Sequence, residues 1–227
     1  MAILELNPAD TTAARLNKLR AGVLGANDGI VSVAATVIGV AAATQSVPVI
    51  ATAGFAALAA GAFSMSAGEY ISVSTQRDTE KVLIEDEEDH DGIRSRLTAQ
   101  LQQDGAEPAT AAAAARQMVT HSPKHALGMV EGVDPDDLVN PWQAAIASFV
   151  AFIIGAILPL ATILLLPAAA RIPGTFASVL VALALTGYVS ARLGEANPRR
   201  AMVRTMIGGA LAMAATYGIG NLFDVPV

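Results

Sequence analysis

The sequence predicts an all-α, polytopic membrane protein with five transmembrane helices and a cytoplasmic helical insert between the second and third. Of its 227 residues, 53% are hydrophobic and only 15% are charged. A soluble globule carries about 25% charged residues, so this chain lacks the polar surface to cover itself in water. Several uncharged stretches also reach the roughly 20 apolar residues that a spanning helix needs. The charges gather instead in one internal segment.

The uncharged stretches place the five helices. Between Gly29 and Gln76 the one charged residue is Glu69, and this region is long enough for two helices joined by a turn at 44–48. We expect helices over 20–44, 49–76, 141–166, 172–191 and 205–223. The chain should therefore divide into an N-terminal segment (1–19), two helices (20–76), an insert (77–140) and three further helices (141–227).

The distribution of Lys and Arg predicts the orientation. Basic residues concentrate on the cytoplasmic side of membrane proteins. If the N-terminus and the insert are cytoplasmic, 13 of the 14 basic residues lie inside and only Arg171 lies outside. We therefore expect the N-terminus in the cytoplasm and the C-terminus outside.

The insert differs from the rest of the chain in composition. It holds 14 of the 20 acidic residues, six basic residues and all three histidines. The pattern of the second helix continues through 77–81, Pro108 and Pro123 each open a further helix, and Gly132 ends the last one. We expect about three amphipathic helices in a bundle too small to have a large core of its own.

Asp28 and Glu69 are the two acidic residues expected well inside the bilayer. Asp28 lies eight residues after Arg20, and Glu69 lies eight residues before Arg77. In antiparallel helices this spacing puts both about 12 Å from the cytoplasmic end. Ionisable groups at such depth are expensive and usually line an ion or proton path. Two facing carboxylates could also exchange protons for a bound cation.

Further ligand atoms lie nearby. Met65 is one turn from Glu69 on the same helix face, and Asn27 and Ser64 add oxygen atoms. A thioether favours Fe(II) or Mn(II) modestly over Mg(II) and Ca(II). The alternatives are structural: Asp28 at a helix end in the interface, Glu69 paired with a polar side chain, and Met65 packed in the bundle.

The insert contains a second group of candidates. Glu85 and Glu88 share a helix face and His90 follows closely, which fits either a metal site or a solvated acidic face. By spacing alone, we interpret Met118, Met129 and Glu131 as core residues.

Three motifs lie in or beside the expected membrane helices. They are Val23–Gly29 (VLGANDG), Ser64–Tyr70 (SMSAGEY, followed by 72–74, SVS) and Asn140–Ala145 (NPWQAA). Together they resemble the vacuolar iron transporter family, in its bacterial branch, over nearly the whole chain. The resemblance implies a homodimer in the bacterial inner membrane. It would export Fe(II) or Mn(II) from the cytoplasm in exchange for protons, along a path near the dimer interface.

The same resemblance implies roles for single residues. Asp28 and Met65 match the family's membrane metal ligands, and Glu69 fits the acidic position of the Gly-Glu-Tyr motif. In the family the insert gathers metal through glutamates and methionines. Here a second Glu-x-x-Glu pair would fall near 96–101, where no acidic residue stands. The candidate insert ligands are Glu85, Glu87, Glu88, Met118, Met129 and Glu131.

Other functions fit parts of the sequence. An intramembrane aspartyl hydrolase would use Asp28 and Glu69, but Gly25-Ala26-Asn27-Asp28 breaks its Gly-x-Gly-Asp signature. A non-transporting metal sensor or scaffold would use the acidic insert. The absence of cysteine excludes disulfides and thiolate metal sites. We expect no enzyme activity, no resident cofactor and no nucleic-acid partner. The partners should be divalent metal ions (Fe(II) and Mn(II) fit equally), the lipid bilayer and a second copy.

Overall fold

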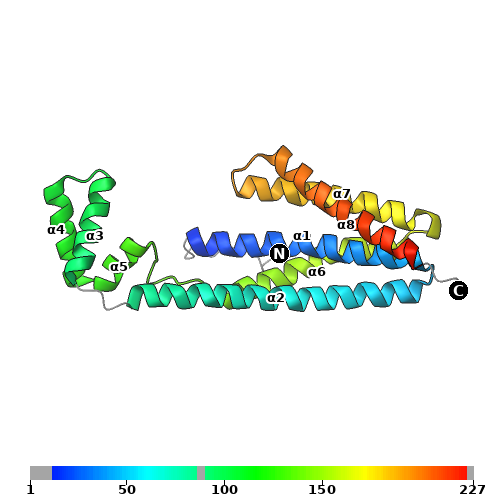
Figure 1. Cartoon of the computed structure of the whole chain (residues 1–227), viewed down its shortest axis with the longest axis horizontal. Helices are drawn as coiled ribbons and strands as arrows, with labels where there is room; N and C mark the ends of the chain where they lie inside the picture. Colours follow the sequence, from blue (N-terminus) through cyan, green and yellow to red (C-terminus); the bar gives the residue numbers. More distant parts are fainter. Residues whose placement is uncertain (1–11, 86–89, 224–227) are drawn as a thin grey trace. The chain divides into compact units, whose positions relative to one another are not determined.

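The structure, a computed structural model, describes residues 12–85 and 90–223. Eight α-helices and no strands occupy these residues, which confirms the all-α class (Figure 1). The chain divides into two compact units. The larger contains Asn17–Tyr70 and the described residues from Trp142 onward, and the smaller contains Ile71–Pro141.

Five long helices supply the larger unit. Four contain stretches long and apolar enough to cross a membrane, namely Leu19–Ala43, Val47–Ile84, Pro141–Leu165 and Ala168–Leu193. The fifth, predicted over 205–223, forms a helix of 25 residues but is not among these four. The helices are α1 (Thr12–Ala43), α2 (Val47–Glu85), α6 (Pro141–Leu165), α7 (Ala168–Leu193) and α8 (Pro198–Leu222).

Most of these helices extend beyond the predicted spans. α1 begins at Thr12 instead of residue 20, and α2 continues to Glu85, which confirms that its pattern runs through 77–81. α8 begins at Pro198 because Asn197 caps it, its side chain accepting from the Arg200 amide at 3.3 Å. Charged residues end an apolar stretch, but Arg and Glu are good helix formers and do not end a helix.

Backbone contact joins α1 to α6. A Cβ atom at Gly25 would lie less than 3.0 Å from the Ser148 carbonyl oxygen, and one at Gly29 would overlap the main chain of Phe152. From the other side, Gly155 of α6 meets the Ala26 carbonyl equally closely. Glycine lets helix backbones approach in this way where no water drives association. The fully buried Phe152 ring then fills the centre of the core.

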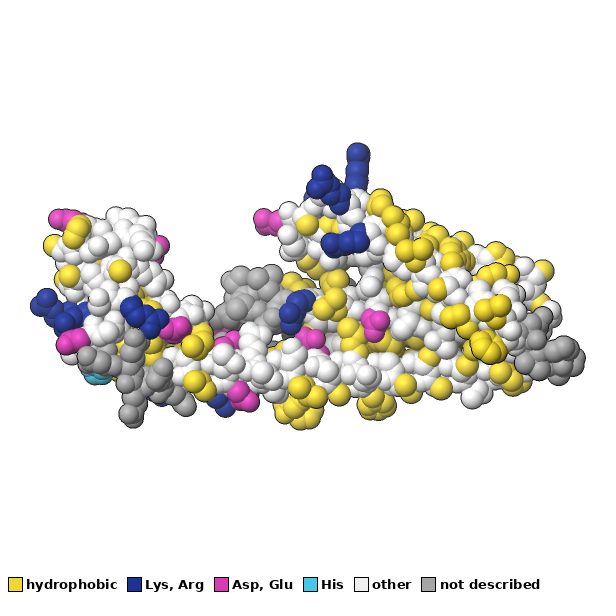
Figure 2. Space-filling view, in the orientation of Figure 1, with side chains coloured by type: hydrophobic (Ala, Val, Ile, Leu, Met, Phe, Trp, Pro, Cys, Tyr) yellow, Lys and Arg dark blue, Asp and Glu magenta, His cyan; other side chains and the backbone are white. Residues whose placement is uncertain are grey.

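Exposed side chains of the larger unit are largely apolar, as a lipid environment requires. Figure 2 shows hydrophobic side chains over the outer faces of α7 and α8. Exposed apolar residues of these two helices include Val181, Leu185, Val203, Ile207 and Leu211, each more than half exposed. Arginines stand near the turn between these helices, at 192, 199, 200 and 204.

The smaller unit contains a three-helix bundle, as the sequence predicts. Its helices are α3 (His90–Gln103), α4 (Pro108–His121) and α5 (Pro123–Glu131). Each contributes apolar side chains to one small core, which includes Leu97, Val119 and Leu127. Gly132 ends α5 in the left-handed conformation, at a φ of 71°, as expected for its place in the sequence.

Glu80 joins the two ends of the insert. Its Oε1 accepts a hydrogen bond from Gln76 Nε2 at 2.9 Å, one turn earlier in α2. Its Oε2 accepts from the Val139 amide at 3.2 Å, where the chain returns to α6. The Glu80 side chain thus links α2, by which the chain enters the insert, to the segment by which it leaves the insert.

The α1–α6 contact predicts a sharp difference between glycines. Gly29→Ala should destabilise the protein by about 1–3 kcal/mol, because the added methyl group meets backbone that cannot move aside. Gly208→Ala in α8 should be neutral or slightly stabilising, since a Cβ there meets nothing within 4 Å. Thermal unfolding of the two purified variants in detergent measures the difference. Equal stability of the two variants would contradict the close contact.

Candidate metal site in the membrane helices

Asp28 lies on an exposed stripe of α1. Arg20, Leu24 and Asp28 are all exposed and follow one another at four-residue intervals, so they line one face of the helix. The neighbouring face carries Gly25 and Gly29 and is closed by α6. The contact with α6 therefore fixes α1 and leaves the Asp28 carboxylate accessible.

Asn27 adds a buried oxygen next to Asp28. Among the described residues, nothing donates a hydrogen bond to its buried Oδ1. Leaving a buried acceptor unsatisfied costs roughly 1–3 kcal/mol, so a hydrogen-bond donor or a cation bound to this oxygen would be stabilising. An amide oxygen is a hard ligand of the kind that suits Mn(II) and, with a soft neighbour, Fe(II).

Two of the motifs identified in the sequence meet around Glu69. Ser66 Oγ donates a hydrogen bond to the Ala145 carbonyl oxygen at 3.1 Å. The rings of Tyr70 and Trp142 lie 4.8 Å apart at a 57° tilt. These contacts fasten α2 to the start of α6 on both sides of Glu69 in the sequence. The Glu69 carboxylate is therefore carried on a well-fixed segment.

The contacts of α2 also set the depth of the site residues. Val37 of α1 touches Gly54 of α2, and counting from this contact places Met65 within two residues of the level of Asp28. Glu69, four residues after Met65, lies at the level of Gly22, which is six residues or about 9 Å nearer the N-terminal end of α1 than Asp28. The equal depth expected for the two carboxylates is therefore not observed. That expectation aligned the helices on their flanking arginines, whereas the short turn at 44–46 sets a different register.

Glu69 has a partner in the structure. Arg20 Nη2 lies 3.5 Å from Glu69 Oε1, and the side chains are 54% and 12% exposed respectively. Pairing with a polar side chain was one interpretation of Glu69, and it is what the single chain shows. Met65 similarly packs against the apolar core, in keeping with its structural interpretation.

A single chain does not assemble a complete ligand set. Within the described residues, no three His, Asp or Glu side chains lie close enough together to hold one metal ion. Asp28, Asn27 and Met65 remain candidate ligands at similar depth in α1 and α2.

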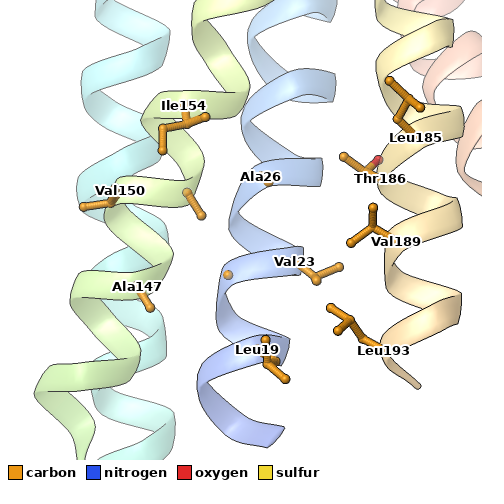
Figure 3. A pocket seen from close by; sticks show the side chains of 12 residues that line it. Leu19, Val23, Ala26, Ala147, Val150, Ile154, Leu185, Thr186, Val189 and Leu193 are labelled. Carbon is orange, nitrogen blue, oxygen red and sulfur yellow. The ribbon is translucent and has the colours of Figure 1, made fainter. Parts of the chain in front are cut away.

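The apolar groove between α1, α6 and α7 lies away from these residues. It has a volume of about 410 Å³ and is lined by apolar side chains with Thr186 as a polar exception (Figure 3). Its α1 wall consists of Leu19, Gly22, Val23 and Ala26. At 100° per residue, this wall faces away from Asp28, so the groove offers no cation ligands.

The insert candidates are placed as follows. Met118 packs against the insert core, and Met129 is 44% exposed. The Glu131 carboxylate forms an ion pair with Arg96, across α5 and α3. Glu87 and Glu88 lie outside the described residues, as does the side chain of Glu85 at the end of α2.

Two of the three histidines of the insert are engaged in local contacts. The Nε2 atom of His125 lies 3.0 Å from Asp136 Oδ2, and His121 Nδ1 lies 3.0 Å from the Gln117 carbonyl oxygen. The His125 contact ties α5 to the returning chain, whereas the His121 contact lies within α4. Sequence reasoning missed the first because it depends on the tertiary arrangement.

Comparison with known proteins decides the family. The profile of the VIT family matches residues 19–221. The chain belongs to the VIT family. Vacuolar iron transporter homolog 5 of Oryza sativa subsp. japonica is 38% identical over 93% of this chain and 83% of its own length. The vacuolar iron transporter of Acanthamoeba castellanii is 38% identical over 91% and 78%. Vacuolar iron transporter homolog 1 of Arabidopsis thaliana is 37% identical over 92% and 84%.

Membership of the VIT family confirms the resemblance found in the motifs. It also supports an integral membrane protein, in agreement with the four apolar helices. The matched region includes Asp28, Met65, Glu69 and the whole insert. The relatives are named vacuolar iron transporters, so the chain is a member of a transporter family.

The Arg96–Glu131 pair predicts how Glu131 behaves. Glu131→Gln should lower stability by up to about 1 kcal/mol, because the lost ion pair is partly exposed. The loss should be the same with and without a metal chelator, since the partner is a guanidinium. Thermal unfolding of the full chain with EDTA or with Mn(II) tests this. A destabilisation seen only with Mn(II) would show that Glu131 is a metal ligand.

Proposed function

We propose that this VIT-family protein exports Fe(II), Mn(II) or both from the cytoplasm in exchange for protons, with Asp28, Met65 and Glu69 lining the ion path. The observation that carries the proposal is a pair of carboxylates within the apolar stretches of α1 and α2, beside the unsatisfied Asn27 oxygen. Ionisable groups at such positions mark ion pathways. The names of the relatives, vacuolar iron transporters, favour iron as cargo.

A homodimer would complete the partial site. One chain offers Asp28, Asn27 and Met65 but no cluster of three acidic or imidazole groups among its described residues. Two copies related by a twofold axis would bring each ligand in twice. The exposed stripe that contains Asp28 is a suitable face for this, together with α2, of which only 17% of the most apolar stretch is buried.

Proton exchange would follow from the same groups. When the cation leaves, two Asp28 carboxylates facing each other would repel, and taking up a proton relieves the repulsion. The cation and the proton would then compete for the same oxygen atoms. This competition is sufficient to couple their movements without a separate proton path.

The location and orientation complete the proposal. The excess of Lys and Arg places the N-terminus and the insert in the cytoplasm and the C-terminus outside, with α8 as a fifth span in the bacterial inner membrane. The insert would help collect metal through Glu85, Glu87, Glu88 and the two methionines, 118 and 129. Glu131, held by Arg96, would contribute least.

Removing the charge of Asp28 tests the transport site. In Asp28→Asn, metal-for-proton flux should fall by roughly tenfold or more, because a dehydrating cation loses its counter-charge. Glu69→Gln should also reduce flux, and Met65→Leu should reduce it less while weakening discrimination against Mg(II) and Ca(II). Metal uptake into proteoliposomes with an imposed pH gradient measures this, with internal pH recorded in parallel.

Asp28→Asn should still fold, and its stability serves as the control. Replacing a carboxylate by an amide of the same shape removes an expensive desolvated charge, so unfolding should occur at the same or a higher temperature. Wild-type exchange by a folded Asp28→Asn protein would eliminate the proposed site.

Reporter fusions test the orientation. A reporter after Val227 should lie outside, whereas one inserted near Gly105, in the turn between α3 and α4, should be cytoplasmic. If α8 does not cross the membrane, both reporters will be found on the same side.

A further inference from the structure

We propose that Arg20 is the resident counter-ion of Glu69, which a divalent cargo ion has to displace, and that this exchange selects divalent over monovalent cations. The assignment rests on the proposed transport function and adds a specificity-determining residue to it. Neither of the motifs that contain Asp28 and Glu69 includes Arg20; its role comes from the ion pair between α1 and α2.

The two partners differ in freedom. The Glu69 side chain is only 12% exposed, and contacts of Ser66 and Tyr70 with α6 hold the flanking backbone. The Arg20 side chain is 54% exposed and lies on the open stripe of α1. At 3.5 Å, the contact between Nη2 and Oε1 is also longer than a strong charge-assisted hydrogen bond. The pair should therefore open by movement of Arg20 and not of Glu69.

Charge decides which ions can replace Arg20. A guanidinium carries a single positive charge, so Arg20 gives Glu69 one positive partner. A monovalent cation brings no more charge than the guanidinium and has to shed water to bind. A divalent cation brings twice the charge, and the attraction at a given distance doubles with it. Displacing Arg20 therefore gives a monovalent ion no net gain in electrostatic attraction to Glu69, whereas a divalent ion still gains.

The position of the Arg20–Glu69 pair indicates where along the ion path divalent cations are selected. Counted from the Val37–Gly54 contact, Glu69 lies about 9 Å nearer the N-terminal end of α1 than Asp28 and about 6 Å nearer than Met65. A cation entering from that end, which the charge distribution predicts to be cytoplasmic, meets Glu69 first. Glu69 with Arg20 would be the outer position, where valence is tested. Asp28 with Met65 and Asn27 would be the inner position, where ligand type is tested.

Binding of Mn(II) to the full-length protein in detergent tests the assignment. Arg20→Gln should bind Mn(II) roughly fivefold more tightly than wild type in the absence of competing monovalent ions, because the tethered competitor is gone. Replacing a bulky organic cation by K⁺ at constant ionic strength should then weaken binding in Arg20→Gln but not in wild type. Arg20→Lys keeps the charge and should retain the wild-type resistance to K⁺.

A second comparison isolates Glu69. Adding Arg20→Gln to Glu69→Gln should leave the Mn(II) affinity of Glu69→Gln unchanged, since Arg20 acts only through that carboxylate. The double variant leaves neither charge unpaired, so this comparison remains available if Arg20→Gln alone does not fold. A purely structural tie would lower thermal stability without changing the response to K⁺.

The outcomes separate this assignment from the transport function. Wild-type Mn(II) affinity and K⁺ resistance in Arg20→Gln would overturn the role of Arg20, as would a change in affinity in the double variant. Either result leaves the flux of wild type and its loss in Asp28→Asn untouched. Absence of Mn(II) and Fe(II) flux in wild type would instead refute the function itself.

Discussion

The contact of α1 with α6 is the constraint on which the larger unit depends. Gly25, Gly29 and Gly155 bring two backbones together without intervening side chains. In a membrane, where burying apolar surface gains little, such close van der Waals packing is a main source of helix association. Because the glycines occupy one face of α1, the orientation of every other residue on that helix is fixed. The accessibility of Asp28 and the burial of the Asn27 oxygen both follow from this orientation.

Acidic charge inside an apolar helix requires an opposing charge, and this requirement explains much of the site. Glu69 is nearly buried and has Arg20. Asp28 is exposed on its stripe and is available to an ion or to a second chain. In the insert, by contrast, charged side chains pair with one another: Arg96 with Glu131, and His125 with Asp136. A carboxylate that already has a fixed partner is a weaker metal ligand. Asp28 is therefore a stronger candidate ligand than Glu69 or Glu131.

Much of this arrangement could be predicted from the sequence. Apolar length gave the membrane helices, and proline and glycine positions gave the ends of α4 and α5. The depth of Glu69 could not be predicted in this way, because it depends on the register between α1 and α2. That register is set by the contact of Val37 with Gly54 and by the turn between the two helices. The amino-acid composition of the turn does not define its length. The pairing of Arg20 depends on the same register: in the sequence it is a charge beside an apolar stretch, whereas in the structure its long side chain reaches Glu69. Apolar length does not qualify α8 as a span, because small and polar residues lower the mean hydropathy of this regular helix.

Glu80 has a consequence for how such a chain can evolve. By binding both Gln76 and the Val139 amide, it holds the two ends of the insert side by side. A segment whose ends are already adjacent can be lengthened, shortened or exchanged while the helices on either side keep their connection. The three-helix bundle also has its own small core, formed by residues of α3, α4 and α5. The insert is therefore built as an exchangeable module, which can be gained or lost by recombination without redesigning the apolar helices on either side.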